Sequence, residues 1–323
     1  MPSKTGIGLA VLSAAAFSTS GSFARSLIDA GWTPGAAVAA RVSVAALLLI
    51  VPGIVALRGR WRALSRRPAM LATYGVVAVA GSQLCYFHAV QHLAVGVALL
   101  IEYMGVVLVV GWMWTRHGHR PRRLTGAGSV VALLGLVLVL NPAHDARLDL
   151  AGVLWGFGAA VGLAVFFVLS AKVGEELPPL VAAAAGMTVG AVTLLVLGAV
   201  GAVPLHATFG VVDLAGRQVS WLVPVIGLSL LAAVVPYVAG IAAARALGPK
   251  LASFVGLTEV VFAVIVAWLL LGELPTAMQI VGGVLIVAGV VLVHMDEMRG
   301  PTLPAESAES GSRAVLEGVP CAS

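Results

Sequence analysis

The chain is poor in charge and in cysteine, and each shortage excludes a class of protein. Charged residues make up only 10% of the 323 residues and hydrophobic residues 60%, with a mean hydropathy of +1.05. So few polar side chains cannot cover the surface of a water-soluble domain. The two cysteines, Cys85 in an apolar segment and Cys321 near the end, are too differently placed to indicate a disulfide framework. The composition predicts a membrane protein.

Long apolar runs occupy most of the sequence. A spanning helix needs about 20 apolar residues, and runs such as residues 130 to 140 lack the alternation of a transmembrane β-strand. We therefore expect an all-α membrane protein of ten transmembrane helices. The breaks at charged, Gly and Pro clusters place them at residues 7–28, 35–57, 69–90, 95–115, 124–141, 150–172, 179–200, 220–243, 251–271 and 276–295.

The distribution of basic residues predicts the orientation. Of the 19 lysines and arginines, fifteen fall on one predicted side, Arg25, Arg147 and Arg217 fall on the other, and Arg41 lies within a span. Because cytoplasmic loops retain positive charge, both termini are expected in the cytoplasm of a multi-pass plasma-membrane protein. The net charge of +5 is scattered over short loops, so it indicates topology and no nucleic-acid partner.

An internal repeat divides the chain into two halves. A shift of 157 residues superposes an Ala-aliphatic pair and a glutamate, and two glycines seven apart follow in each half. The matched residues are Ala89 with Ala246, Val90 with Leu247, Glu102 with Glu259, Gly128 with Gly282, and Gly135 with Gly289. Five spans is an odd number, so the second copy enters the bilayer from the opposite side. We expect two inverted five-helix repeats, residues 7–141 and 150–295, between a cytoplasmic N-terminus (1–6) and a disordered cytoplasmic tail (296–323).

Three deep charged residues are the main candidates for function. A carboxylate at the centre of a membrane helix costs about 2.5 to 3.5 kcal/mol and marks a functional candidate. Glu102 and Glu259 lie at matching depths, and Arg41 lies at nearly the depth of Glu102. An Arg41–Glu102 ion pair is expected, acting as a lock between helices or as a gate. Gly186 occupies the repeat position of Arg41, so Glu259 has no matching partner and is the better candidate to bind and release a proton.

Other polar and aromatic residues in the spans are candidates to line a substrate path. Gln83, Tyr86 and His88 belong to one polar stretch of the third span, Tyr103 follows Glu102, and Tyr237 follows Pro236. Packing between helices explains the same residues almost equally well. Pro236 leaves a carbonyl without its helical partner, which a neighbour, water or substrate must satisfy.

Sites for cofactors, metals and catalysis are not expected. His88 and His92 lie one turn apart without a third ligand at suitable spacing. The sequence has no phosphate-binding loop and no His-Glu-x-x-His motif, so an enzyme is not indicated. The glycines of the fifth and tenth spans allow close contact between helices or between the two copies of a homodimer.

The two segments 89–140 and 246–293 resemble the EamA domains of the drug/metabolite transporter superfamily. Each has a glutamate, an aliphatic run, a loop and a Gly-rich helix, and Leu271-Gly272-Glu273 matches the family's helix ending. The chain departs from that pattern at Tyr103 and Val260, where the family usually has proline. The stretch from Ile101 to Gly105 is most similar to the amino-acid exporter branch.

The resemblance implies a secondary transporter of small molecules. We expect an exporter of amino acids, related metabolites or drugs, working by alternating access with proton coupling or exchange. A passive channel or facilitator is the main alternative, and a non-transporting membrane scaffold is the second.

Overall fold

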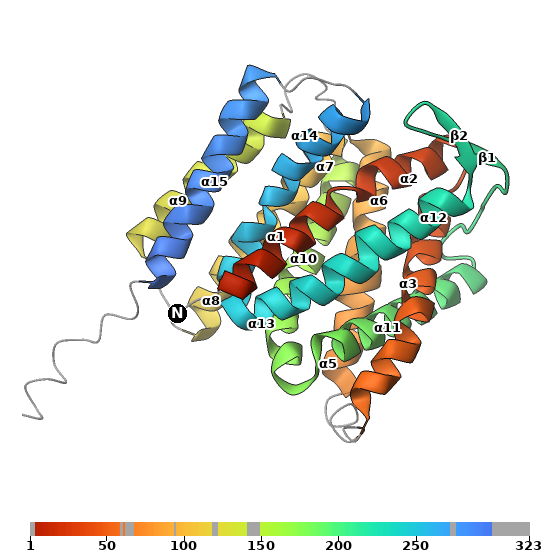
Figure 1. Cartoon of the computed structure of the whole chain (residues 1–323), viewed down its shortest axis with the longest axis horizontal. Helices are drawn as coiled ribbons and strands as arrows, with labels where there is room; N and C mark the ends of the chain where they lie inside the picture. The colour runs from red at the N-terminus through yellow and green to blue at the C-terminus, as the bar shows by residue number, and fades with distance from the viewer. Residues whose placement is uncertain are drawn as a thin grey trace, which may run out of the picture.

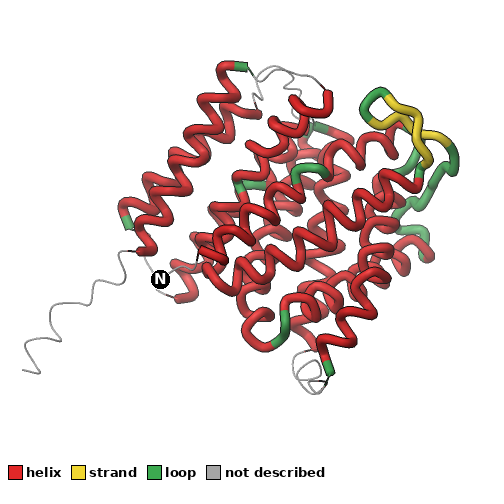
Figure 2. The backbone as a smooth tube through the Cα atoms, in the orientation of Figure 1, coloured by secondary structure: helices red, strands yellow, loops and turns green. Residues whose placement is uncertain are grey.

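The protein is an almost entirely helical bundle with one β-hairpin at its edge (Figures 1 and 2). The computed structural model describes residues 4–58, 61, 68–93, 95–117, 122–140, 149–271 and 276–298. In the first half the elements are α1 (Lys4–Phe17), α2 (Ser20–Asp29), α3 (Pro34–Leu57), α5 (Pro68–Thr73), the π-helical η1 (Tyr74–Gly81), α6 (Ser82–His92), α7 (Val95–Glu102), α8 (Met104–His117) and α9 (Arg123–Leu140). In the second half they are α10 (Leu150–Glu176), α11 (Pro179–Ala199), β1 (Val211–Leu214), β2 (Arg217–Ser220), α12 (Leu222–Ser229), the π-helical η3 (Leu230–Val234), α13 (Val235–Gly256), α14 (Thr258–Leu271) and α15 (Ala277–Met298).

The helices have the length and composition of membrane spans. Within the described residues, nine helical stretches are long and apolar enough to cross a bilayer. The longest, Leu222–Gly256, has 35 residues, but it is interrupted at Gly248, whose φ of 77° and ψ of 163° are not helical. Such a positive φ favours glycine because it has no Cβ. The described part of α14 is only 14 residues long. The helical membrane class is therefore confirmed, whereas the count of ten and the inversion stay predictions.

Several spans are broken at their middle. The first span divides at Ser18 and Thr19 into α1 and α2. Tyr103 separates α7 from α8 directly after Glu102, and Leu257 separates α13 from α14 two residues before Glu259. These breaks form although Tyr103 and Val260 replace the prolines of the family pattern. The broken helices place both glutamates beside irregular backbone, which membrane proteins tolerate where it is buried or faces a cavity.

Helices α9 and α15 pack side by side (Figure 1) through the repeat-related glycines. Gly128 lies against Gly289 and Gly135 against Gly282, so the two helices run antiparallel. A Cβ at Gly135 would lie 2.5 Å from the Gly282 carbonyl oxygen, and one at Gly289 would lie 2.6 Å from that of Gly128. These glycines therefore provide the close contact between α9 and α15 within one chain.

The hairpin, which the sequence analysis did not predict, lies at one end of the bundle. Ala215 and Gly216 form its turn with positive φ values of 54° and 74°, and the Asp213 carboxylate accepts a hydrogen bond from the Gly216 amide at 3.0 Å. Positive φ at both central residues is typical of a type I′ turn, which is favoured in two-residue hairpins. We call this the hairpin end of the bundle.

Both ends of the described chain lie at the opposite end. Gly6 packs against Ala246 and Leu247 near Lys250, and Lys250 forms ion pairs with Asp296 and Glu297. We call this the Lys250 end. The predicted tail began at residue 296, but α15 continues to Met298 and Asp296 is buried. The helix continues past residue 295 because Lys250 and Thr125 provide partners for Asp296 there. The rest of that predicted tail, 299–323, lies outside the described residues.

The glycine contacts generate a stability prediction. A Gly135→Ala substitution places its Cβ 2.5 Å from the Gly282 oxygen and 2.7 Å from the Ile286 nitrogen, so α9 and α15 must separate at a cost of about 1 to 3 kcal/mol. The melting temperature in detergent should fall. Gly126→Ala is the matched control on the same helix, because a Cβ there meets nothing within 4 Å and alanine favours the helix. Equal melting temperatures for the two variants would contradict this packing.

Candidate functional site

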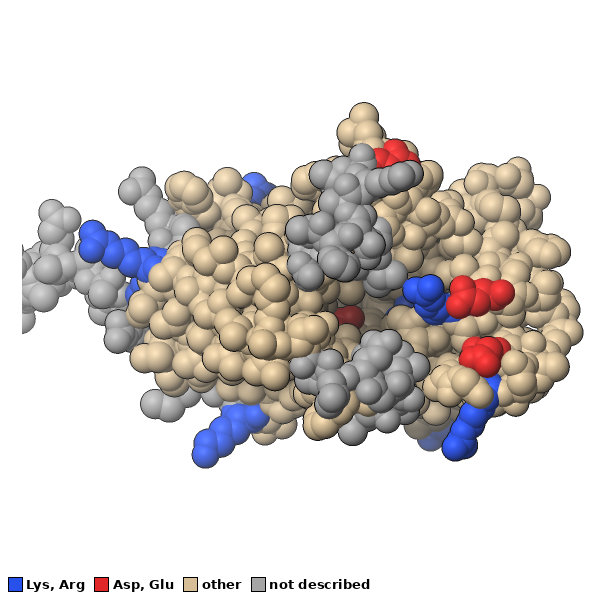
Figure 3. All heavy atoms as spheres, turned by 90° about the horizontal axis from the view of Figure 1, so that it is seen from above, with Lys and Arg blue, Asp and Glu red and all other residues tan. Residues whose placement is uncertain are grey.

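A large cavity opens at the hairpin end of the bundle. Its volume is about 1870 Å³, and its lining includes α2 and the hairpin turn at the mouth and Arg41, Glu102 and Glu259 in the interior. Figure 3 views the molecule from above and shows a hollow with an acidic side chain deep inside it. Ala252 and Gly256 of α13 also line the cavity. The cavity therefore has a wide mouth, and the membrane-embedded charges lie within it.

Arg41 is held in a polar cluster at the wall of this cavity. Only 2% of the residue is exposed. Its guanidinium donates hydrogen bonds to Gln83 Oε1 at 2.6 Å and to Ser20 Oγ at 3.2 Å, and it lies over the Phe17 ring at 5.9 Å. Gln83 in turn forms a side-chain hydrogen bond with Tyr237. The guanidinium thus connects α2, α3, α6 and α13.

The backbone carbonyl of Ala232 is the remaining partner of Arg41. Pro236 lies four residues after Ala232 and has no N–H to donate to this carbonyl, so its α-helical partner is missing. The carbonyl of Pro236 accepts a hydrogen bond from Ser13 Oγ at 2.8 Å. The expectation that a neighbour satisfies the carbonyl freed by Pro236 is confirmed, and that neighbour is Arg41.

The expected Arg41–Glu102 ion pair is not formed. Arg41 uses its donors on Ser20, Gln83 and Ala232, and among the described side chains none forms an ion pair with it. It interacts electrostatically with both Glu259 and Glu102 at longer range. The prediction was wrong because equal depth in two spans does not determine which faces of the helices meet, and the freed Ala232 carbonyl is a nearer acceptor.

The two glutamates differ in a way opposite to the one expected. Glu259 was predicted to lack a partner, but the Tyr103 side chain from the first half of the chain lies close enough to interact with its carboxylate. Glu102 lines the cavity, and no hydrogen bond or ion pair of its carboxylate occurs among the residues that the structure describes. Glu102 is thus the carboxylate with free acceptor sites, and Glu259 is the one positioned by a tyrosine.

Most of the remaining candidate residues line the cavity, and one lies outside its lining. Gln83, Tyr86, Tyr103 and Tyr237 line the cavity, as predicted for a substrate path. His88 does not belong to its lining: its ring stacks on Trp155 with 4.8 Å between centroids, and its Nδ1 lies 3.2 Å from Gln91 Oε1. Within the described ranges, no group of three or more His, Cys, Asp or Glu could hold a metal ion.

Several residues of the site were not among the candidates predicted from the sequence. Ser20 and Phe17 contact Arg41 from the broken first span, and Phe166 of α10 packs edge-to-face on Tyr237 at 5.2 Å between ring centroids. The run Ser18-Thr19-Ser20-Gly21-Ser22 was the available signal, because five small polar or glycine residues within a span favour a break over a regular lipid-facing helix. Phe166 carries no such signal.

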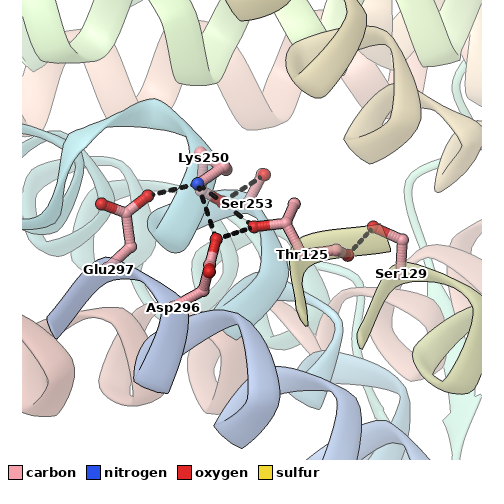
Figure 4. A network of polar contacts seen from close by, with 6 residues as sticks. All are labelled: Thr125, Ser129, Lys250, Ser253, Asp296 and Glu297. Atoms are coloured by element: carbon pink, nitrogen blue, oxygen red, sulfur yellow. Dashed lines mark hydrogen bonds and ion pairs between the residues drawn. The ribbon is translucent and has the colours of Figure 1, made fainter. Parts of the chain in front are cut away.

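A polar network lies at the Lys250 end (Figure 4). Lys250 Nζ lies 2.6 Å from Glu297 Oε1, 3.9 Å from Asp296 Oδ2 and 3.4 Å from Thr125 Oγ1, and the Thr125 hydroxyl donates to Asp296 Oδ2 at 2.5 Å. We call these four residues the Lys250 network. It connects α9 of the first half to α13 and α15 of the second, and none of its residues lines the cavity.

A short helical segment lies between the network and the cavity. It runs from Pro249 to Gly256, with the non-helical Gly248 before it and the break at Leu257 after it. Lys250 belongs to the Lys250 network at one end, whereas Ala252 and Gly256 line the cavity and Glu259 follows the other end. We call it the floor segment.

The fold and this cavity define the class as a multi-pass membrane transporter. The EamA-like transporter family model matches residues 4–141 and 150–295. The chain belongs to the EamA-like transporter family.

Two similar proteins are named transporters, and one solved structure shares the fold. An uncharacterized transporter of Archaeoglobus fulgidus is 28% identical over 222 residues, covering 69% of this chain and 74% of that protein. The uncharacterized transporter YdfC of Bacillus subtilis is 27% identical over 170 residues, about half of each chain (52% and 52%). A solved crystal structure has the same fold, with a TM-score of 0.74 over 91% of this chain and 98% of that one at 18% identity.

The Arg41 cluster generates a second stability prediction. Arg41→Met leaves Gln83 and the Ala232 carbonyl without their donor, at a cost of about 1 to 3 kcal/mol for each buried group, so the melting temperature in detergent should fall. Arg25→Met is the control, because the Arg25–Asp29 pair at 3.5 Å is 74% and 67% exposed and such pairs contribute about 0 to 1 kcal/mol. If the melting temperature of Arg41→Met were as high as that of Arg25→Met, the cluster would not contribute to stability.

Proposed function

We propose that the protein is a secondary active transporter that exports small metabolites, such as amino acids or related compounds, across the plasma membrane in exchange for protons. The observation that supports this best is a cavity that opens at the hairpin end and contains two membrane-embedded glutamates, while the Lys250 network lies outside its lining at the other end. An intramembrane carboxylate is costly unless it functions. Two carboxylates in a one-sided cavity suit an exchange of substrate and protons.

The sidedness follows from the positive-inside rule. The Lys250 end carries the basic loops, so we assign it to the cytoplasm together with both termini. The cavity then opens to the outside, which corresponds to the state in which an exporter releases its substrate and takes up protons. Alternating access requires a second state in which the Lys250 end opens and the hairpin end closes.

The Lys250 network is suited to hold the cytoplasmic side closed. It joins helices of both halves, so a movement of one half against the other must break it. Asp296 is 4% exposed, and a buried carboxylate separated from its lysine and threonine is costly unless water reaches it. Opening to the cytoplasm supplies that water. The contacts therefore favour the outward-open state but still allow the state that is open to the cytoplasm.

Glu259→Gln and Glu102→Gln test proton coupling. Metabolites that accumulate in the medium only when the protein is expressed identify the cargo, which is then loaded into proteoliposomes. We expect transport driven by a pH gradient to fall at least about tenfold in both variants, because the glutamine side chain does not bind and release a proton near neutral pH. Counterflow of labelled against unlabelled cargo at equal pH should persist. If either variant kept full pH-driven transport, that glutamate would have no part in proton coupling. If cargo on the opposite side did not accelerate the flux, the protein would be a channel.

Lys250→Met tests the network as the cytoplasmic gate. In a background with Cys85→Ser and Cys321→Ser, Ala252→Cys places one thiol at the cavity lining. Labelling by an impermeant thiol reagent from the Lys250 end should accelerate about threefold or more when Lys250→Met shifts the population inward, and labelling from the hairpin end should slow. Lys172→Met, an exposed lysine of α10, is the control. Unchanged labelling from both sides would show that the network does not act as a gate.

A further inference from the structure

The described side chains that line the cavity have an excess of negative charge. Three arginines, Arg25, Arg41 and Arg217, face four carboxyl groups, Asp29, Asp213, Glu102 and Glu259, which leaves a formal charge of −1 when all four are ionised. The two arginines and two aspartates at the mouth balance one another. The excess therefore resides in the interior, where two glutamates share the cavity with one arginine.

That arginine is not available to a substrate carboxylate. Its guanidinium already donates to Gln83, Ser20 and the Ala232 carbonyl, and its face is covered by Phe17. A substrate that took these donors would leave the Ala232 carbonyl unpaired in the membrane, because Pro236 cannot replace the guanidinium. Arg41 is thus a structural cation, and it is the only arginine or lysine among the described residues of the cavity's interior.

Helix N-termini also attract anions, but Glu259 occupies the one at the break before α14. Glu259 lies in the first turn of that helix, where its own negative charge is favoured by the helix dipole. A substrate anion there would lie beside a carboxylate. Glu102, in contrast, presents acceptor oxygens that no described side chain uses, so a donor from the substrate meets no competitor.

Aromatic rings complete the lining. Eight of the lining residues are Phe or Tyr. Phe166 and Phe17 both pack edge-to-face with Tyr237, at 5.2 and 5.5 Å between ring centroids. Tyr86 lies within electrostatic range of both glutamates. Ring faces attract cations, more strongly where water is excluded, and they also accept an apolar body.

We propose that the cavity selects organic cations, that is, amines with an aromatic or apolar body, and disfavours substrates with a carboxylate. This proposal rests on the proposed function and narrows its substrate class: within the range of amino acids and related compounds, it favours the amines over the amino acids themselves. Glu102 accepts the ammonium group, the aromatic rings contact the apolar body, and Tyr103 keeps Glu259 in position beside them.

Three probes with the same ring test the proposal: 2-phenylethylamine as the cation, phenylalanine as the zwitterion and 3-phenylpropionate as the anion. Binding to the purified protein in nanodiscs at pH 7 is measured by calorimetry. The amine should bind at least about tenfold more tightly than phenylalanine, and the anion should bind most weakly. Glu102→Gln should remove this preference, whereas Asp149→Asn, which keeps a helix-capping side chain outside the cavity, should retain it.

The outcomes separate this proposal from the proposed function. Tighter binding of phenylalanine or phenylpropionate, amine binding that is unaffected by Glu102→Gln, or binding of none of the probes would overturn the selection of organic cations. Counterflow of phenylalanine but not of the amine would overturn it too, while leaving the transporter function intact. Amine binding without exchange across proteoliposomes would support the binding site and contradict transport.

Discussion

The rule that no polar backbone group remains unpaired in hydrocarbon shapes the centre of this molecule. Pro236 removes one helical hydrogen bond, and the carbonyl of Ala232 is left for another donor. Arg41 provides that donor and at the same time joins Ser20 and Gln83. One proline thus explains why an arginine can lie buried in a membrane span, and the arginine explains why four spans converge on the cavity wall.

This arrangement gives the two halves different tasks. The first half supplies the buried arginine, the unpaired Glu102 and Tyr103, and the second supplies the carbonyl that holds Arg41 and the glutamate that Tyr103 positions. Each half therefore supplies an interaction partner for a polar side chain of the other half. A cavity built from such cross-contacts depends on how the halves sit against each other, which is the property that an alternating-access transporter changes.

The sequence predicted the membrane class and most span positions, because both follow from apolar length and from Gly, Pro and charged breaks. It also identified seven lining residues of the cavity, since polar side chains in lipid-spanning segments face inward. It could not predict which of them touch. Arg41 was assigned to Glu102 by depth alone, but rotation of each helix about its axis and the freed carbonyl decide the pairing. The hairpin was missed because its residues, 211–220, were taken as part of a loop.

The floor segment connects the two regions where charge is buried. Pro249–Gly256 is about 12 Å long at 1.5 Å per residue, and it lies between interruptions at Gly248 and Leu257. Lys250 belongs to this segment, and Glu259 follows it after the break at Leu257. In the transport cycle that we propose, the floor segment is therefore the shortest covalent connection between the Lys250 network and Glu259.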